Sequence, residues 1–391
     1  MNSEGFYRRP LPEQLISFSS TQGREVFREA LASGGMEAYF TLAEQFHTQS
    51  EPAFCGLGTL VVVLNALSID PGRVWKGVWR WYGEEFLDCC QPLSQVKEQG
   101  ITFDEFVCLA RCNGLKVEPF RYDASTLKDF RETVSKVTSL PQRTHIVVSY
   151  SRQGLGQTGD GHFSPLAGYH RERDLVLLLD VARFKYPPHW VPLSMLWEAF
   201  AATDSMTGKC RGYILLQKEA ALRETFFLLA VDTSQWMELA PYFQGIIPAI
   251  FTDKNPASLE KMVEIFVDNF PLPVNSIITN NSAFSQIEEL LLDIRSNKMF
   301  EVIQNLMIAE AYASKNFPIA SSLSQNQYII ERIVLLLLAC PEQLFVTLSH
   351  DLQSKISHIR ALEKLPHILG SEVSTLQTQM AALQELWLSH Q

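Results

Sequence analysis

The segment that most constrains the fold is the stretch at residues 48–60, which runs into an apolar, helix-like segment at residues 61–67. A run with so few polar side chains predicts a helix in the core of a domain, because a helix that is apolar on all sides has to be buried. Cys55 lies where this core helix would begin.

Two interpretations of Cys55 are open at this point. Backbone N–H groups are unpaired at a helix N-terminus and the helix dipole is positive there, which favours a reactive thiolate. Gln49, six residues upstream, could place an amide N–H beside it. The alternative is an ordinary core thiol, because free cysteine is among the most buried residue types.

Length and composition indicate a globular chain with more than one core. At 391 residues the chain is expected to form two domains, and 46% hydrophobic against 19% charged residues leaves ample surface to bury. The net charge of −10 lies mainly in the C-terminal part, where residues 222–391 carry 10 basic and 18 acidic side chains. The sequence has no basic run, so we expect no binding of nucleic acid.

The number of cysteines and the length of the apolar runs indicate in which cellular compartment the protein is expected. The chain has an odd number of cysteines: Cys55, Cys89, Cys90, Cys108, Cys112, Cys210 and Cys340. Residues 1–10 contain no apolar signal core, and the longest aliphatic run, residues 333–340, is too short for a membrane span. We therefore expect a cytoplasmic protein with free thiols in a reducing environment and no membrane partner.

Four of these cysteines could form a metal site. Cys108 and Cys112 would share one face of a helix at residues 103–113, and the vicinal pair Cys89 and Cys90 could complete a thiolate set. Their spacing matches no established tetrahedral zinc pattern, since C-x2-C pairs are absent. Ordinary buried thiols are the alternative.

The order of the expected elements predicts an α+β fold. Helices are expected within residues 11–47, at the Cys55 segment and at residues 103–113. Strands are expected after them, at residues 115–120, 145–150, 162–170, 175–181 and 211–216, with a helix inserted at 193–202. Helices first and an antiparallel sheet afterwards define this class.

One hairpin brings two chemically important side chains together. If the charged turn at residues 171–174 centres near Glu172, antiparallel pairing sets position 162 opposite about 180 to 182, so His162 and Asp180 become neighbours. An aspartate after four leucines is costly to bury without a partner. Cys55 as nucleophile, His162 as base and Asp180 as its orienting group would form a catalytic set; a structural ion pair and a core cysteine are the alternative.

Four segments, at residues 49–56, 62–73, 159–165 and 179–192, resemble those of phytochelatin synthases, and the resemblance is nearly continuous over about residues 6–217. It implies a papain-like fold and a glutathione γ-glutamylcysteinyltransferase with Cys55, His162 and Asp180 as triad and Gln49 as oxyanion residue. The third triad member differs from the asparagine of papain, and residues 55–58 depart from the protease signature.

The same resemblance implies the reaction and its partners. The Cys55 thiolate would attack the Cys–Gly bond of glutathione, release glycine and pass the γ-glutamylcysteinyl group to a second glutathione or a phytochelatin. It implies no obligatory cofactor: heavy-metal ions such as Cd²⁺, and also Zn²⁺ and Cu, would act mainly as glutathione thiolates. The implied substrate-binding residues are Asp204 for the ammonium and Arg211 for the carboxylate, with Arg183, Tyr186 and Arg152 as further candidates.

We expect a catalytic domain at residues 1–220 and a variable, mostly helical C-terminal domain at residues 221–391. Only Cys340 lies beyond Cys210, which argues against thiol-based metal sensing by that domain. A homo-oligomer is possible. Two other functions stay open: a hydrolase of glutathione or its S-conjugates, and a non-enzymatic thiol metal binder.

Overall fold

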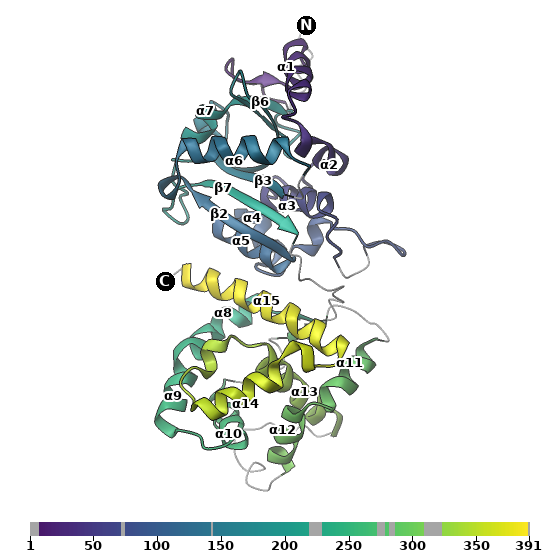
Figure 1. The fold of residues 1–391 in the computed structure, drawn as a ribbon, viewed down its shortest axis with the longest axis vertical. Helices are drawn as coiled ribbons and strands as arrows, with labels where there is room; N and C mark the ends of the chain where they lie inside the picture. The colour runs from purple at the N-terminus through teal and green to yellow at the C-terminus, as the bar shows by residue number, and fades with distance from the viewer. Residues whose placement is uncertain are drawn as a thin grey trace. The chain divides into compact units, whose positions relative to one another are not determined.

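A computed structural model describes residues 8–71, 75–141, 144–218, 229–271, 278–280, 286–308 and 323–389. The chain divides into two compact units, whose boundary lies between the described residues 218 and 229 (Figure 1). Within the described part of the chain, no helix has the length and apolar character needed to cross a membrane.

The first unit is built on a seven-stranded sheet in which every pairing is antiparallel. The strand order is β1-β6-β5-β4-β3-β7-β2. The strands are β1 (Ile16–Ser17), β2 (Leu115–Arg121), β3 (Thr144–Ser151), β4 (Gly161–His170), β5 (Leu175–Leu178), β6 (His189–Pro192) and β7 (Gly212–Lys218).

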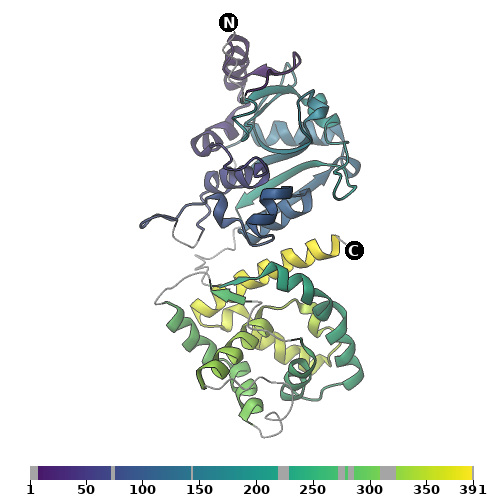
Figure 2. The ribbon, with the colours of Figure 1, turned by 180° about the vertical axis from the view of Figure 1, so that it is seen from behind.

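Helices cover both sides of this sheet, with α6 on one side and α3 and α5 on the other (Figures 1 and 2). They are α1 (Thr21–Ala32), α2 (Glu37–Gln45), α3 (Cys55–Ala66), α4 (Leu93–Gln99), α5 (Phe103–Cys112), α6 (Leu127–Ser139) and α7 (Leu193–Glu198), with single 3-10 turns at η1 (Glu84–Phe86), η2 (Tyr122–Ala124) and η3 (Gln153–Leu155). Five α-helices, α1 to α5, precede the first long strand, β2, which confirms the α+β class.

The two sides of the sheet are held by different contacts. On the α6 side, Phe130 packs in an apolar cluster that includes Tyr150 of β3 and Tyr213 of β7. On the α3 side, the Thr59 hydroxyl donates to the Phe163 carbonyl at 3.1 Å, which satisfies a polar group inside a buried helix. The Phe163 ring also stacks on Phe106 of α5, with ring centroids 4.9 Å apart.

The second unit is mostly helical and contains one short antiparallel pair, β8 (Leu229–Val231) and β9 (Ile278–Asn280). Its helices are α8 (Thr233–Pro241), the π-helical turn η4 (Tyr242–Ile246), α9 (Ile247–Lys254), α10 (Leu259–Asn269), α11 (Gln286–Arg295), α12 (Lys298–Ile308), α13 (Leu323–Ala339), α14 (His350–Arg360) and α15 (His367–Ser389), with 3-10 turns η6 (Glu342–Phe345) and η7 (Leu362–Lys364). Two buried side chains of α15 accept from strand β8: Glu372 from the Leu229 N–H at 3.1 Å, and Gln379 from the Val231 N–H at 2.9 Å.

Candidate active site

Cys55 is the first residue of α3, and the chain before it is fastened to the end of the β4–β5 hairpin. The Gln49 N–H donates to the carbonyl of Val181 at 3.1 Å, one residue after Asp180. Gly56 allows the start of the helix to approach its neighbour closely, because a Cβ at that position would collide with the Ile101 side chain. Backbone contacts therefore set the place of Cys55 relative to Asp180.

His162, in strand β4, and Asp180, which follows strand β5, are in direct contact with each other. His162 Nε2 is 2.8 Å from Asp180 Oδ1, and both side chains are buried. Asp180 follows β5, and its Oδ1 also accepts the Ala182 N–H at 2.9 Å. Since Nε2 is held by the carboxylate, the other ring nitrogen of His162 is left for Cys55.

The electrostatics of these three groups favour a thiolate and imidazolium pair. Burial raises the pKa of the Cys55 thiol, but the charge of His162 and a hydrogen bond with its ring outweigh burial and bring this pKa below its usual value. The pKa of His162 lies above its usual value, because Asp180 and Cys55 outweigh burial and the nearby Arg152 charge. The pKa of Asp180 lies well below its ordinary range, since His162 and Arg152 compensate its burial.

Arg152 is a fourth buried member of this arrangement. Its Nη2 lies 3.0 Å from Oδ1 and 2.9 Å from Oδ2 of Asp180, and its Nη1 donates to Gln157 Oε1 at 2.6 Å. Gln157 Nε2 in turn lies 3.1 Å from His189 Nε2. Neither Gln157 nor His189 was singled out from the sequence, and the family resemblance implied only a substrate-binding role for Arg152.

A cavity of about 470 Å³ opens beside Cys55 and His162. The predicted substrate residues Asp204, Arg211 and Arg152 line it. Its wall also contains residues that the sequence did not single out: Gln99, Gly100, Ile101, Ser149, Asp160, Phe163, Phe184, Lys185 and Met206. The cavity is therefore mixed in character: besides Cys55 and His162, three arginine or lysine and two aspartate side chains line it among apolar and neutral polar ones.

Arg211 is held rigidly at this cavity. Its Nη1 donates to the carbonyls of Ala202 at 2.8 Å and Thr203 at 3.0 Å. Its Nη2 lies 3.4 Å from Asp160 Oδ1 and 3.9 Å from Asp204 Oδ2. The two predicted partners of a γ-glutamyl group thus lie within reach of one another, with Asp160 as a third charged neighbour.

Three other predicted residues lie in different surroundings. The Gln49 side-chain amide donates to the carbonyls of Glu51 at 2.8 Å and Pro52 at 2.9 Å. Among the described residues that line the cavity, neither Arg183 nor Tyr186 is found. Arg183 lies over the Phe46 ring, and the Tyr186 hydroxyl accepts the Thr158 N–H at 2.9 Å beneath Arg152.

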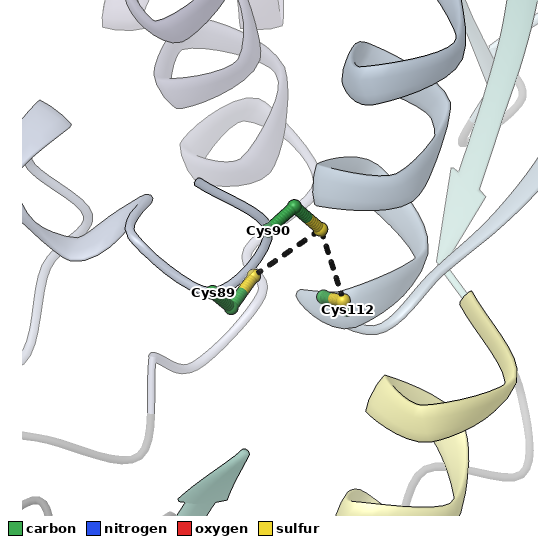
Figure 3. Close-up of side chains that lie close together, drawn as sticks. All are labelled: Cys89, Cys90 and Cys112. Atoms are coloured by element: carbon green, nitrogen blue, oxygen red, sulfur yellow. Dashed lines mark hydrogen bonds between the residues drawn. The ribbon is translucent and has the colours of Figure 1, made fainter. Parts of the chain in front are cut away.

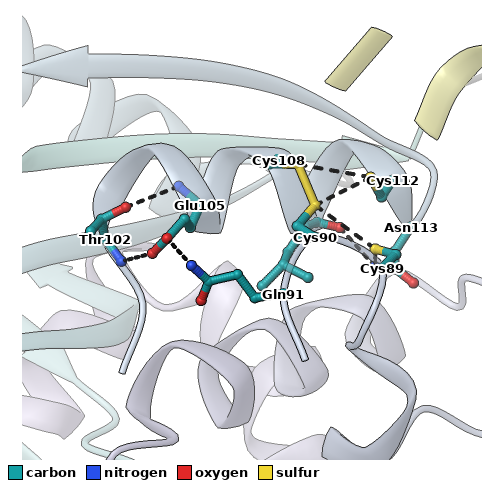
Figure 4. The surroundings of a disulfide bond; sticks show 9 residues. Cys89, Cys90, Gln91, Thr102, Glu105, Cys108, Cys112 and Asn113 are labelled. Atoms are coloured by element: carbon teal, nitrogen blue, oxygen red, sulfur yellow. Dashed lines mark hydrogen bonds between the residues drawn. A yellow bond between two sulfur atoms is a disulfide. The ribbon is translucent and has the colours of Figure 1, made fainter. Parts of the chain in front are cut away.

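The structure corrects the expectation that all cysteines are free thiols. Among the four clustered cysteines, Cys90 and Cys108 form a disulfide (Figure 4). Cys89 and Cys112 keep their thiols and lie close to Cys90 (Figure 3). Sequence spacing could not reveal this pairing, because connectivity does not follow from the positions of cysteines in a chain.

Comparison with known proteins gives consistent matches over the first unit and beyond. Residues 6–213 match the family model described as phytochelatin synthase. The chain is 49% identical over 279 residues to glutathione gamma-glutamylcysteinyltransferase 1 of Arabidopsis thaliana, covering 71% of this chain and 57% of that protein. It is 39% identical over 299 residues to the glutathione gamma-glutamylcysteinyltransferase of Schizosaccharomyces pombe, covering 76% of this chain and 71% of that one.

A second plant relative, glutathione gamma-glutamylcysteinyltransferase 3 of Lotus japonicus, is 48% identical over 280 residues and covers 71% of this chain. The matched region spans 57% and 58% of the two plant proteins. The chain thus spans little more than half the length of these plant relatives.

Proposed function

Because the chain belongs to the phytochelatin synthase family, we propose that it is a papain-like glutathione γ-glutamylcysteinyltransferase that makes phytochelatins from glutathione. In this proposal residues 1–220 form the catalytic domain and residues 221–391 a variable C-terminal domain. The protein would act in a reducing, cytoplasmic environment, where its glutathione substrate and its Cys55 thiol stay reduced.

The first half of the reaction acylates the enzyme. The Cys55 thiolate attacks the carbonyl carbon between cysteine and glycine of glutathione, and His162 gives its proton to the departing glycine nitrogen. Asp180 keeps the imidazole oriented and stabilises its charged form. The products are free glycine and a γ-glutamylcysteinyl thioester on Cys55.

The oxyanion that forms in this step needs hydrogen-bond donors. The Cys55 backbone N–H at the start of α3 is one candidate, and the Gln49 amide is the other. Gln49 Nε2 already donates to the Glu51 and Pro52 carbonyls, so its participation requires one of these bonds to be exchanged for the oxyanion. This exchange is part of the proposal.

The second half transfers the acyl group. The α-amine of a second glutathione, or of a phytochelatin, attacks the thioester while His162 accepts its proton. An acceptor whose thiols are occupied by a soft metal ion such as Cd²⁺ cannot compete as a thiol nucleophile, so the ion enters as part of the substrate. Water in place of the amine would give hydrolysis.

Recognition of the donor requires partners for an ammonium and a carboxylate. Asp204 and Arg211 supply these charges at one side of the cavity. An arginine can meet a carboxylate with two parallel hydrogen bonds, and carbonyl contacts through Nη1 already fix the Arg211 guanidinium. We assign Arg152 to Asp180 first, since their buried contact is direct.

The observation that supports the proposal best is the contact of His162 with Asp180 at a cavity lined by Cys55. Its test incubates the reduced full chain with glutathione and Cd²⁺ and measures glycine and γ-glutamylcysteine oligomers. Both products are expected from the wild type and from Cys340→Ser, a control that removes a cysteine of the second unit. Cys55→Ser should yield neither.

Two results would contradict the proposal. Oligomers formed by Cys55→Ser at the wild-type rate would exclude Cys55 as nucleophile. Glycine and γ-glutamylcysteine appearing without oligomers, with metal present, would identify a hydrolase instead.

A further inference from the structure

Two buried side chains behind the triad, Gln157 and His189, form a chain of contacts that ends on Arg152. Arg152 Nη1 donates to Gln157 Oε1 at 2.6 Å, and Gln157 Nε2 lies 3.1 Å from His189 Nε2. His189 Nδ1 in turn lies 2.8 Å from the Pro187 carbonyl oxygen. Among the described residues that line the cavity, Arg152 is present but Gln157 and His189 are not. These two side chains therefore lie behind the cavity wall.

One assignment of protons satisfies every contact in this chain. A guanidinium can only donate, so the Gln157 amide turns its oxygen to Arg152 and its NH₂ group to His189. His189 then accepts at Nε2 and carries its own proton at Nδ1, where the Pro187 carbonyl accepts it. This is the neutral imidazole. Burial favours the same form, because it keeps the pKa of His189 below its usual value despite the nearby charge of Asp180.

The far end of the chain is anchored in the sheet that also positions Asp180. His189 is the first residue of β6 and pairs with Leu178, the last residue of β5. Asp180 follows two positions after Leu178. Gln157 is fixed from the other side, because its backbone N–H donates to the Arg152 carbonyl at 2.9 Å. The contacts thus close a ring that runs from Asp180 through Arg152 and back to the sheet.

Arg152 and His162 share one oxygen of Asp180. Asp180 Oδ1 lies 2.8 Å from His162 Nε2 and 3.0 Å from Arg152 Nη2. An unrestrained guanidinium tends to meet a carboxylate with two parallel hydrogen bonds, and such a fork would draw Asp180 toward Arg152 and away from His162. Among the hydrogen bonds of the described residues, only Nη2 of Arg152 donates to Asp180, whereas Nη1 donates to Gln157.

We propose that Gln157 and His189 are positioning residues for the triad. They hold Arg152 Nη1, so that Arg152 meets Asp180 through one nitrogen and the carboxylate keeps its hydrogen bond with His162. Loss of either residue releases Nη1 to form the fork, which weakens the support of the imidazolium. The catalytic consequence of this role rests on the proposed function.

The first test follows alkylation of the Cys55 peptide against pH in the full chain, which needs no substrate turnover. Gln157→Leu removes the acceptor for Arg152. It should raise the midpoint of the Cys55 profile by at least about half a pH unit, because a less stable imidazolium supports the thiolate less. Gln153→Leu, the same change at an exposed position of the same loop, should leave the profile unchanged. An unchanged profile in Gln157→Leu would overturn the proposal.

A second background separates positioning from a merely structural effect. Without the guanidinium no fork can form, so Gln157→Leu added to Arg152→Gln should shift the profile no further. A structural loss would instead add a similar shift in both backgrounds. That result would also overturn the proposal.

Variants of His189 test the other end of the chain. His189→Phe keeps a ring but removes the acceptor for Gln157, so it should shift the profile in the same direction as Gln157→Leu. His189→Gln can still present an acceptor oxygen to Gln157 and should stay closer to the wild type. Equal shifts in the two variants would assign His189 to packing and contradict its positioning role.

The transfer reaction gives a separate readout. The kcat of Gln157→Leu should fall roughly tenfold to a hundredfold, the scale for displacing a catalytic group by about 1 Å, while KM for glutathione should change less than about twofold. KM is spared because Gln157 does not line the cavity. A raised KM with unchanged kcat would contradict the proposal. If the wild type makes no phytochelatin but the alkylation shifts appear, the proposed function fails while the positioning of the triad holds.

Discussion

The surroundings of Cys55 and Cys112, two cysteines of the first unit, shift their thiol pKa values in opposite directions. Burial raises the pKa of the Cys55 thiol, yet the charge and hydrogen bond of His162, together with Arg152, bring it below its usual value. A hydrogen bond with Cys89 and burial raise the pKa of Cys112 well above its usual value. The contrast teaches that the charges of His162 and Arg152, together with partial exposure, distinguish the reactive thiol from the buried one.

The largest expected effect comes from removing that partner. His162→Ala should lower the transfer rate by about 10²–10⁴-fold, the range for loss of a general base. It should also raise the pKa of Cys55, since the charge of His162 lowers it in the wild type. Alkylation of Cys55 followed against pH measures this shift. An unchanged alkylation profile would show that His162 does not activate the thiol.

Arg152→Gln is the next test, because it leaves the triad in place but removes its buried cation. Loss of one partner of a buried ion pair should cost about 3–5 kcal/mol of unfolding free energy. Arg183→Gln, a control at the Phe46 ring, should cost much less. Urea unfolding of the two variants makes the comparison, and equal losses would contradict the special place of Arg152.

Arg152→Gln also has a signature in the pH dependence of the rate. Arg152 lowers the pKa of both Cys55 and His162, so its removal should raise both. The acid limb of the rate profile follows thiol ionisation and the basic limb follows loss of the imidazolium proton. Both limbs should therefore move to higher pH. Movement of only one limb would show that Arg152 does not act on both groups.

Asp180→Asn tests the linkage between charge and stability. The folded pKa of Asp180 is depressed, so its contribution to stability is fully present above the unfolded value of about 3.9 and is lost as the pH falls below it. The variant should be less stable than the wild type at neutral pH, and the gap should narrow as the pH falls through this window. Thermal unfolding at several pH values measures it. A difference in stability between variant and wild type that does not change with pH would show that the variant loses packing rather than a charge interaction.

The smallest expected effect is at Cys340 in the second unit, where burial raises the thiol pKa to about 11. Cys340→Ala should cost about 1 kcal/mol of unfolding free energy and leave transfer unchanged. In native wild-type protein an alkylating reagent should modify Cys55 first and reach Cys112 and Cys340 only after unfolding. Modification of Cys340 before unfolding, found by peptide mapping, would contradict the difference in reactivity between Cys55 and the buried thiols.

The sequence predicted most where the decisive contacts are local. The proximity of His162 and Asp180 follows from counting across one short hairpin, and their atoms lie 2.8 Å apart. Helix α3 follows from an apolar run. Helix α1 lies within residues 11–47, where helices were expected, and the structure shows that the Ser20 hydroxyl caps it by accepting the Gly23 N–H at 2.9 Å.

What the sequence left out depends on tertiary pairing. Arg152 meets Asp180 across 28 positions, through strands β3 to β5, and no local pattern marks that contact. Helix α6 (Leu127–Ser139) was not predicted, although its buried Phe130, Val134 and Val137 have helical spacing and Thr126 caps it. Strand β6 is four residues long, too short for a reliable pattern. The C-terminal part that was predicted to be mostly helical, residues 221–391, lies partly outside the described residues.

The central claim, that Cys55 carries the acyl group, is tested most directly by mass spectrometry of the reduced protein mixed with glutathione and quenched in acid. A phosphine reductant added before analysis removes mixed disulfides but leaves a thioester. We predict a γ-glutamylcysteinyl adduct, lacking glycine, on the peptide that contains Cys55. The absence of that adduct, or its presence on a peptide with Cys89 or Cys112 instead, would contradict the account.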